Sequence, residues 1–409
     1  MKNYKIKFEE VSDVLKTTDY IINKFGPRLP GSEACIKAAG QLKKEYERCF
    51  DKVYENNYTQ YPDSFFYIPS IIAFAYFLGI FFFSIPHLIY LSIIFYVIGL
   101  VYLITQFIFF RNTFDKLFKK YAGKNVFGII EPRDKLKQQI IISAHHDSPY
   151  ICNFLSSNQK LYSFRLFLPI IFYLYAFLTS ILLLISKTIR DNSSYYLVSL
   201  IIICIGCLLM LPLFWYNNRK GSPGAGDNLI SSVIGIKVAE IIKKNFNSFA
   251  HTRIIVLSSD GEEIGLKGIQ AFINQNKDLL KECKTFVLNI DSIFKYKDLS
   301  LLTSDRNGTI KLSNQLANEI IDISNQLGYS VQKKKLPFGG GGTDAAHFAK
   351  EGIESTSFIG ISTNMIRDGL YYHTANDIVE NLDPAAVEAT INIAVNFVLY
   401  KDMIMENTL

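Results

Sequence analysis

Four short runs of β-branched and apolar residues each lead to a side chain that can bind a metal ion. The runs are residues 139–143, 253–257, 285–290 and 357–361, and the side chains after them are His145, Glu262 with Glu263, Asp291 and His373. A further acid, Asp227, stands just before a helical stretch. Imidazoles and carboxylates that follow successive parallel strands converge on one edge of a sheet, where a metal ion can be held in fixed geometry.

Helical stretches separate these strand-like runs. Their apolar residues recur at helical spacing in residues 32–48, 229–244, 312–327 and 384–400. Strands that alternate with helices predict an α/β fold, with a mostly parallel central sheet flanked by helices. In such sheets ligands bind beyond the carboxyl ends of the strands, which is where the metal-competent residues lie.

The apolar residues, 49% of the chain, are concentrated in two blocks. Residues 65–110 are long enough for two membrane crossings, with a turn at Pro86 and His87, and residues 164–216 form a second pair divided by the polar stretch 187–194. Four helices buried in a soluble core would show an amphipathic stripe, whereas these segments are apolar all round. We therefore expect four transmembrane helices in two hairpins.

Two hairpins return the chain to the face that it left. We expect residues 1–63, 112–162 and 217–409 to form one discontinuous domain, with hairpins at 64–111 and 163–216. The basic residues near the helix ends on the domain side are Lys52, Arg111, Lys116, Lys119, Lys120, Lys124, Lys160, Arg165, Arg219 and Lys220. The opposite side has Lys187 and Arg190. The positive-inside tendency then places the domain on the cytoplasmic face of an integral, multi-pass membrane protein.

Composition excludes other classes of protein. The net charge of +6 is small for 409 residues, and no basic run is interleaved with aromatic residues, so no nucleic-acid partner is expected. The six cysteines lack the spacing of a disulfide framework, and Cys204 and Cys207 lie within an apolar run, where they are interpreted as packing residues. The first sixty residues contain no apolar stretch of the signal-peptide kind.

The motifs and their order resemble those of the di-zinc aminopeptidases of metallopeptidase family twenty-eight, which are related to bacterial leucyl aminopeptidases and glutamate carboxypeptidase. That family shows His-x-Asp, Gly-x-Asp-Asp-Asn, a Glu pair followed by Gly-Leu, an Asp after a strand, and Tyr-His-Thr. The counterparts here are His145-His146-Asp147, Gly224-Ala225-Gly226-Asp227-Asn228, Glu262-Glu263-Ile264-Gly265-Leu266, Asn289-Ile290-Asp291 and Tyr372-His373-Thr374. The resemblance covers the part outside the hairpins.

The sequence departs from the family pattern in two ways. His145 and Asp227 are 82 residues apart, far more than in the family, and the block 164–216 occupies the gap. Gly226 replaces the first Asp of the usual Asp-Asp-Asn, while Asp227 keeps the second.

The resemblance implies two Zn²⁺ ions bridged by Asp227. One ion would be completed by His145 and Asp291, and the other by Glu263 and His373. Two dications bridged by a carboxylate lower the pKa of a shared water.

Three further residues receive catalytic roles from the resemblance. Glu262 would be the general base, Asp147 would hold the imidazole of His145, and Tyr372 would donate to an oxyanion. His146 points away from the metals by strand alternation and is left unassigned. His347 fits a site role or a packing role equally. The glycine run 339–342 is interpreted as a cleft wall, because no Lys-Ser or Lys-Thr follows it as in a phosphate loop.

Several alternatives stay open. Taken singly, Glu262 and Glu263 could serve only a helix dipole, and Asp227 could cap the helix that follows it. The expected function is a membrane-anchored, zinc-dependent exopeptidase, most simply an aminopeptidase, acting on peptide substrates beside a lipid bilayer. The alternatives are an inactive peptidase-fold membrane receptor or scaffold, and a zinc acyltransferase of the glutaminyl-cyclase kind. Substrate preference and oligomeric state are not encoded in recognisable motifs.

Overall fold

A mixed sheet of eight strands lies at the centre of the molecule, in a computed structural model that describes residues 4–246, 248–362 and 369–407. In spatial order the strands are β1 (Lys52–Gln60), β2 (Tyr121–Ile130), β6 (Thr252–Ser259), β3 (Gln138–His145), β7 (Lys284–Ile293), β12 (Glu354–Gly360), β8 (Ser300–Leu302) and β11 (Gln332–Lys334). The four strands from β6 to β12 run parallel to one another. The pairs β1–β2, β2–β6 and β12–β8 are antiparallel, and the edge strand β11 is parallel to β8. The predicted mostly parallel sheet is confirmed.

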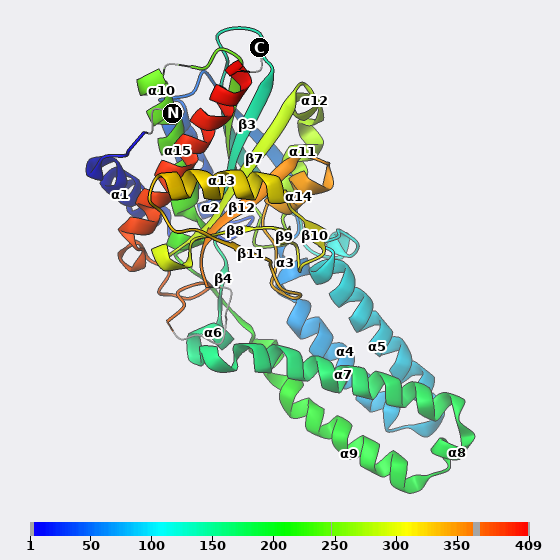
Figure 1. Ribbon diagram of the computed structural model, residues 1–409. Coiled ribbons are helices and arrows are strands. Elements are labelled where there is room, and N and C mark those ends of the chain that lie inside the picture. The colour runs from blue at the N-terminus through cyan, green and yellow to red at the C-terminus, as the bar shows by residue number, and fades with distance from the viewer. Residues whose placement is uncertain (1–3, 247, 363–368, 408–409) are drawn as a thin grey trace.

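Helices cover both faces of this sheet (Figure 1). One face packs against α1 (Phe8–Phe25), α2 (Glu33–Tyr46), α10 (Ile230–Phe246), α13 (Asn314–Gln326) and α15 (Pro384–Asn407), and the other against α11 (Lys267–Gln275), α12 (Lys277–Lys281) and α14 (Ala345–Lys350). Side-chain alternation along β3 shows the two layers, because Ile140 and Ile142 join the first core and Ile141 joins the second.

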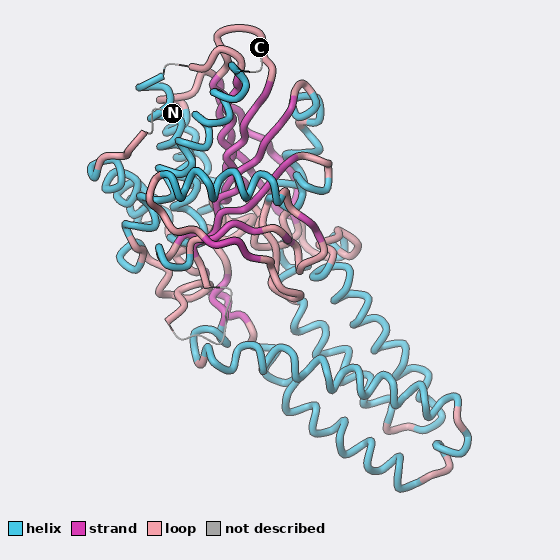
Figure 2. Tube along the Cα trace, viewed as in Figure 1, coloured by secondary structure: helices cyan, strands magenta, loops and turns pink. Residues whose placement is uncertain are grey.

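The two apolar blocks form a helical arm that extends from the domain (Figure 1), and Figure 2 shows no strand along it. Its helices are α4 (Ile68–Phe83), α5 (Ile89–Leu103), α7 (Tyr162–Ile185) and α9 (Ser193–Met210), with α8 (Lys187–Arg190) at the tip of the second pair. Three stretches of the described chain are long and apolar enough to cross a membrane, namely Pro86–Ile108, Gln159–Ile185 and Ser193–Trp215. The 16-residue α4 is shorter, so a fourth crossing stays a prediction.

The base of the arm is tied to the domain by short elements. These are α3 (Pro62–Phe66), β4 (Tyr150–Cys152), α6 (Asn153–Ser157) and β5 (Asn217–Gly221). Strands β4 and β5 pair antiparallel, with Tyr150 opposite Gly221, so the second hairpin leaves and re-enters the domain at one place. The remaining small sheet joins β9 (Ser304–Asp305) to β10 (Ile310–Lys311).

Helix α10 approaches the strands that carry the metal-competent residues very closely. A Cβ atom on Gly235 would lie 2.7 Å from Cγ1 of Val256 in β6 and 3.7 Å from Cγ2 of Ile142 in β3. Only glycine permits this separation between helix and sheet.

Replacement of Gly235 by alanine should therefore lower the Tm of the purified protein. Overpacking of a filled core costs about 1–3 kcal/mol, more than the roughly 1 kcal/mol that alanine gains in a helix. Gly40→Ala in α2 is the matched control, because nothing lies within 4 Å of its added Cβ. Differential scanning fluorimetry should show Gly40→Ala unchanged or more stable, and an equal rise in both variants would contradict the packing described.

Candidate metal centre

The structure brings together all five side chains that the sequence analysis proposed as ligands. His145 ends β3, Asp291 lies near the end of β7, Asp227 precedes α10, Glu263 follows β6 and His373 lies beyond β12. Four of these side chains are less than a tenth exposed, whereas His373 retains 22% exposure. Segments more than 200 residues apart in the sequence thus share one rim of the sheet.

Asp227 lies between the two histidines and presents a different carboxylate oxygen to each. Its Oδ1 is 3.5 Å from Nε2 of His145, and its Oδ2 is 3.2 Å from Nε2 of His373. On the first side, Oδ1 of Asp291 lies 3.8 Å from Nε2 of His145. On the second side, Oε2 of Glu263 lies 3.3 Å from Nε2 of His373. His145 and Asp291 therefore form a first half-site, and His373 and Glu263 form a second. The two half-sites share the carboxylate of Asp227.

These separations fit ligands of common metal ions. Two nitrogen or oxygen ligands at about 2.0–2.1 Å from a tetrahedral zinc ion lie about 3.3–3.4 Å apart. Among the described residues no hydrogen-bond partner reaches four buried atoms that face the site, which are Nε2 of His145, Oδ2 of Asp227, Oε1 of Glu263 and Nε2 of His373. Orphaned buried lone pairs of this kind fit divalent cations.

The pKa shifts of the site residues reflect an excess of buried negative charge. Burial alone would lower the pKa of His373, but the charges of Glu263 and Asp227 raise it to about 10. Burial raises the pKa of Glu263 to about 8, assisted by the charge of Asp227. Burial would raise the pKa of Asp227, yet both histidines hold it below its ordinary value. Without metal, protons therefore take the place of part of the missing positive charge.

Asp147 organises the first half-site and the Glu262-Glu263 turn together. Its Oδ1 lies 3.3 Å from Nδ1 of His145, so the nitrogen opposite Nε2 has a fixed partner. Its two oxygens also accept hydrogen bonds from the backbone N–H groups of Glu262 at 3.3 Å and Glu263 at 3.1 Å. One buried carboxylate thus orients a histidine and the adjacent acidic pair.

Glu262 and Tyr372 both face the metal-competent cluster. Oε2 of Glu262 lies 3.8 Å from Nε2 of His145, and burial raises its pKa well above the ordinary value, with Asp291 and Glu263 adding to the effect of burial. The ring of Tyr372 stacks on that of His373 at 3.8 Å. Burial, reinforced by Asp227 and Glu263, raises the pKa of Tyr372, so its hydroxyl keeps its proton.

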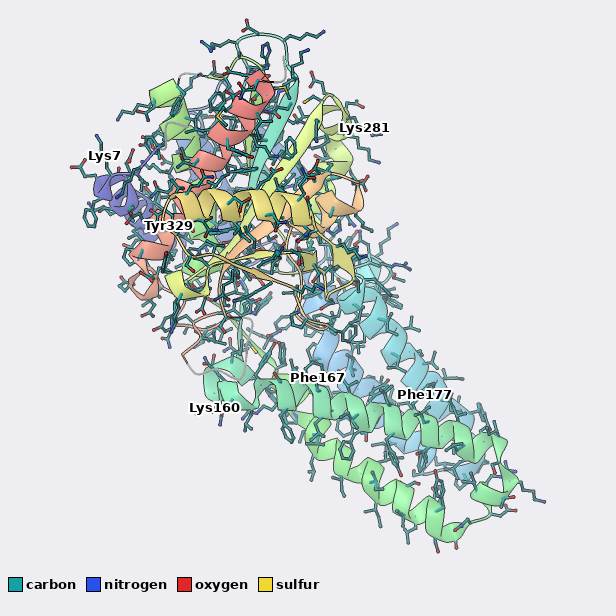
Figure 3. All side chains as sticks on the ribbon, viewed as in Figure 1. Lys7, Lys160, Phe167, Phe177, Lys281 and Tyr329 are labelled. Carbon is teal, nitrogen blue, oxygen red and sulfur yellow. The ribbon has the colours of Figure 1, made fainter. Side chains whose placement is uncertain are left out.

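Other motif residues lie elsewhere. Burial, together with the charges of Lys350, Arg306 and Lys267, lowers the pKa of His347 to about 3, so its charged neighbours are cations rather than the ligand carboxylates. The glycine run 339–342 reaches the arm, because a Cβ on Gly339 would lie 3.6 Å from the ring of Phe167 in α7. Figure 3 labels Phe167 near the domain end of α7.

Two buried residues that the sequence analysis did not single out for a role hold the ligand loops. Asp377 accepts hydrogen bonds from the N–H groups of Gly226 at 2.7 Å and Asp227 at 3.2 Å. The guanidinium of Arg28 donates to the carbonyls of His146 at 2.7 Å and Gly224 at 2.7 Å. Both act through the backbone, and no local spacing in the sequence points to such contacts.

The replacement of an Asp by Gly226 has a steric cause. A Cβ at this position would lie 2.4 Å from Cε1 of Phe294, whose ring packs against the backbone just before Asp227. A side chain would push this segment away and displace the shared carboxylate.

The sequence model of Peptidase family M28 matches residues 214–398, a segment that contains Asp227, Glu262, Glu263, Asp291 and His373. The match identifies residues 214–398 as a peptidase family M28 segment. This M28 chain is thereby a metallopeptidase-type hydrolase by family, and the family implies zinc binding. The matched segment begins at the end of the second hairpin, so His145 and Asp147 lie outside it and are brought in by the fold.

Solved structures share the fold at low sequence identity. LapB from Legionella pneumophila is 13% identical over 95% of this chain and 71% of its own, with a TM-score of 0.55. A zinc aminopeptidase from Bacillus subtilis, BSAP, is 13% identical over 96% and 95%, with a TM-score of 0.56. A Bacteroides thetaiotaomicron glutaminyl cyclase bound to N-acetylhistamine is 10% identical over 96% and 98%, with a TM-score of 0.56. No curated protein matches by sequence.

Zinc binding by the M28 chain should release protons near neutral pH. In the metal-free protein His373 and Glu263 have pKa values of about 10 and about 8, so both hold a proton at about pH 7, whereas a metal binds their deprotonated forms. Affinity should therefore fall as the pH is lowered. Isothermal titration calorimetry in buffers of different ionisation enthalpy measures the release, and a heat that is independent of the buffer would contradict it.

Proposed function

We propose that this M28 chain is a membrane-anchored, zinc-dependent exopeptidase that acts as an aminopeptidase. The observation that supports it most is the carboxylate of Asp227, which faces one half-site with each oxygen. His145 and Asp291 would hold one zinc ion, and Glu263 and His373 the other. When bound, such ions supply Lewis acidity, which lowers the pKa of a water and polarises the scissile carbonyl.

Glu262 is the proposed general base. Its carboxylate faces the first half-site, and burial raises its pKa well above the ordinary value, so that it binds a proton more readily than an exposed glutamate does. It would take a proton from the attacking water and pass it to the nitrogen of the departing amine. Asp147 supports this role by fixing the backbone of Glu262 and the ring of His145.

Tyr372 is the proposed donor to the carbonyl oxygen as negative charge develops there. Its hydroxyl keeps its proton, and its stacking on His373 orients the ring. Donation from a preorganised hydroxyl stabilises the transition state more than the ground state.

The charge around the site favours a free amino terminus over a free carboxyl terminus. In the described part of the chain, no lysine or arginine forms an ion pair with the five proposed ligands or Glu262; only histidines do. Arg28, although buried nearby, donates to backbone carbonyls. The described part of the site therefore lacks the lysine or arginine that would pair with the free carboxyl terminus of a carboxypeptidase substrate.

Replacement of Glu262 by glutamine should abolish most turnover while leaving metal content unchanged. General-base catalysis is worth about 10²–10⁴-fold, so kcat should fall within that range. The measurements are metal content by mass spectrometry and hydrolysis of matched peptides with free and blocked amino termini. Glu47→Gln, at an exposed glutamate that ends α2, is the control.

The same peptide panel separates the alternatives. Release of a free amino acid from unblocked peptides supports an aminopeptidase, whereas cyclisation of amino-terminal glutamine with loss of ammonia would indicate a glutaminyl-cyclase-like acyltransferase. A wild-type chain that binds zinc and leaves every peptide intact would support the receptor or scaffold alternative. Unchanged turnover in Glu262→Gln would refute the proposed mechanism.

The arm supports the membrane part of the proposal, because polar groups lie in its interior and apolar side chains on its surface, the opposite of the arrangement in a soluble protein. Tyrosine hydroxyls lie inside it, with Tyr76 donating to the carbonyl of Ile203 at 2.9 Å and Tyr173 to that of Tyr96 at 3.0 Å. Large apolar side chains face outward, as shown by Leu178 at 56% and Leu208 at 72% exposed. Such an apolar surface is unfavourable in water, whereas in a lipid bilayer it is covered by hydrocarbon chains.

The chain should remain in the membrane pellet after alkaline carbonate extraction, and the domain should face the cytoplasm. In intact cells an impermeant maleimide should label a cysteine introduced by Asn192→Cys at the tip of the second hairpin, and should reach half-buried Cys283 in the domain only after permeabilisation. Release into the carbonate supernatant would contradict membrane insertion, and the reverse labelling would invert the proposed orientation.

A further inference from the structure

His146 is the member of the His145-His146-Asp147 motif that the proposed mechanism does not use. Its side chain is fully buried, and its Nδ1 lies 2.9 Å from the hydroxyl of Ser258 in β6. Among the described residues its Nε2 has no hydrogen-bond partner. A buried imidazole nitrogen without a partner destabilises the folded protein unless something binds it.

Two other metal-competent side chains lie beside His146. Cys35 is in the first turn of α2, and Asp260 follows directly on β6. One ligand atom from each of Cys35, His146 and Asp260 lies within 4.8 Å of the other two, and all three residues are fully buried. A thiol, an imidazole and a carboxylate together form a donor set that suits zinc and similar transition ions.

The spacing of the sulfur and oxygen agrees with a shared ion. Sγ of Cys35 lies 3.4 Å from Oδ1 of Asp260. Ligands at about 2.3 Å for sulfur and about 2.0 Å for oxygen on one tetrahedral ion lie about 3.5 Å apart. A thiol donating to the carboxylate would also explain this distance, but it would leave Nε2 of His146 without a partner.

The surrounding groups fix the orientation of these donors. Oδ2 of Asp260 accepts hydrogen bonds from the N–H of Lys124 at 3.0 Å and from Nε2 of Gln60 at 3.2 Å, so Oδ1 is the oxygen that faces Cys35. The hydroxyl of Ser258 holds the imidazole of His146 through Nδ1, which leaves Nε2 for a ligand. Partners of this kind are typical of metal-binding residues.

We propose that Cys35, His146 and Asp260 bind a divalent transition ion of the zinc class, separate from the pair at Asp227. Cys35 would bind as the thiolate and release its proton to solvent. The ion would join α2 to the ends of β3 and β6, which lead directly into His145 and into the Glu262-Glu263 turn. Its role would be structural, because the three side chains are closed off from solvent.

Cobalt substitution tests this proposal, because the ligands proposed around Asp227 contain no sulfur. The full chain in detergent is stripped with a chelator, and Co²⁺ is added. A near-ultraviolet thiolate-to-cobalt charge-transfer band is expected, and it should be lost in Cys35→Ser with one metal equivalent fewer by mass spectrometry. Cys283→Ser, at a half-buried thiol, is the matched control and should keep both. Asp227→Asn should lose metal at the paired site and keep the band.

A measurement on unaltered protein covers the case in which Cys35→Ser does not fold. X-ray absorption at the zinc edge of the wild type should show a sulfur scatterer at about 2.3 Å. The proposal is overturned if the wild type lacks both the charge-transfer band and the sulfur scatterer, or if folded Cys35→Ser keeps the band and the full metal content.

Discussion

The position of Asp227 between His145 and His373 is the constraint on which the rest of the site depends. A single carboxylate can serve both sides only if segments from distant parts of the chain meet around it, and its two oxygens lie 3.5 Å from His145 and 3.2 Å from His373. The fold achieves this with parallel strands that all end at one rim, and with the β4–β5 pair, which closes the 82-residue separation between His145 and Asp227. The helical arm can therefore be inserted between two proposed ligands without displacing either.

Buried negative charge is the second constraint, and it explains residues that have no chemical role of their own. Asp147 and Asp377 accept hydrogen bonds from backbone N–H groups of the two acidic segments, while Arg28 binds carbonyls of the loops that lead to them. Burial raises the pKa of Asp377 to about 8, with the charge of Asp227 adding to the effect of burial. The network holds its acidic groups in place before a cation binds, which is the preorganisation that a metal-dependent hydrolase requires.

The α/β fold was predictable from sequence because the central strands and covering helices have clear periodicities, and the proposed ligands were predictable because they follow strand ends in a known order. Other features were not. The edge strand β1 alternates between exposed and half-buried residues, and Asp377 and Arg28 act through backbone atoms of segments about 150 and 200 residues away. Three described helices are long and apolar enough to cross a membrane, whereas the 16 residues of α4 fall short of the expected fourth.

The interleaving of arm and site gives the arm a structural role at the candidate metal centre. The N–H of Cys152, at the base of the second hairpin, donates to the carbonyl of His373 at 2.8 Å, so the arm supports a proposed ligand directly. The most direct test of the account is anomalous diffraction at the zinc edge from crystals of the zinc-loaded chain. It should show two peaks about 3.5–4 Å apart, one beside each oxygen of Asp227. A single peak in this region, or a pair that does not contact Asp227, would contradict the shared carboxylate.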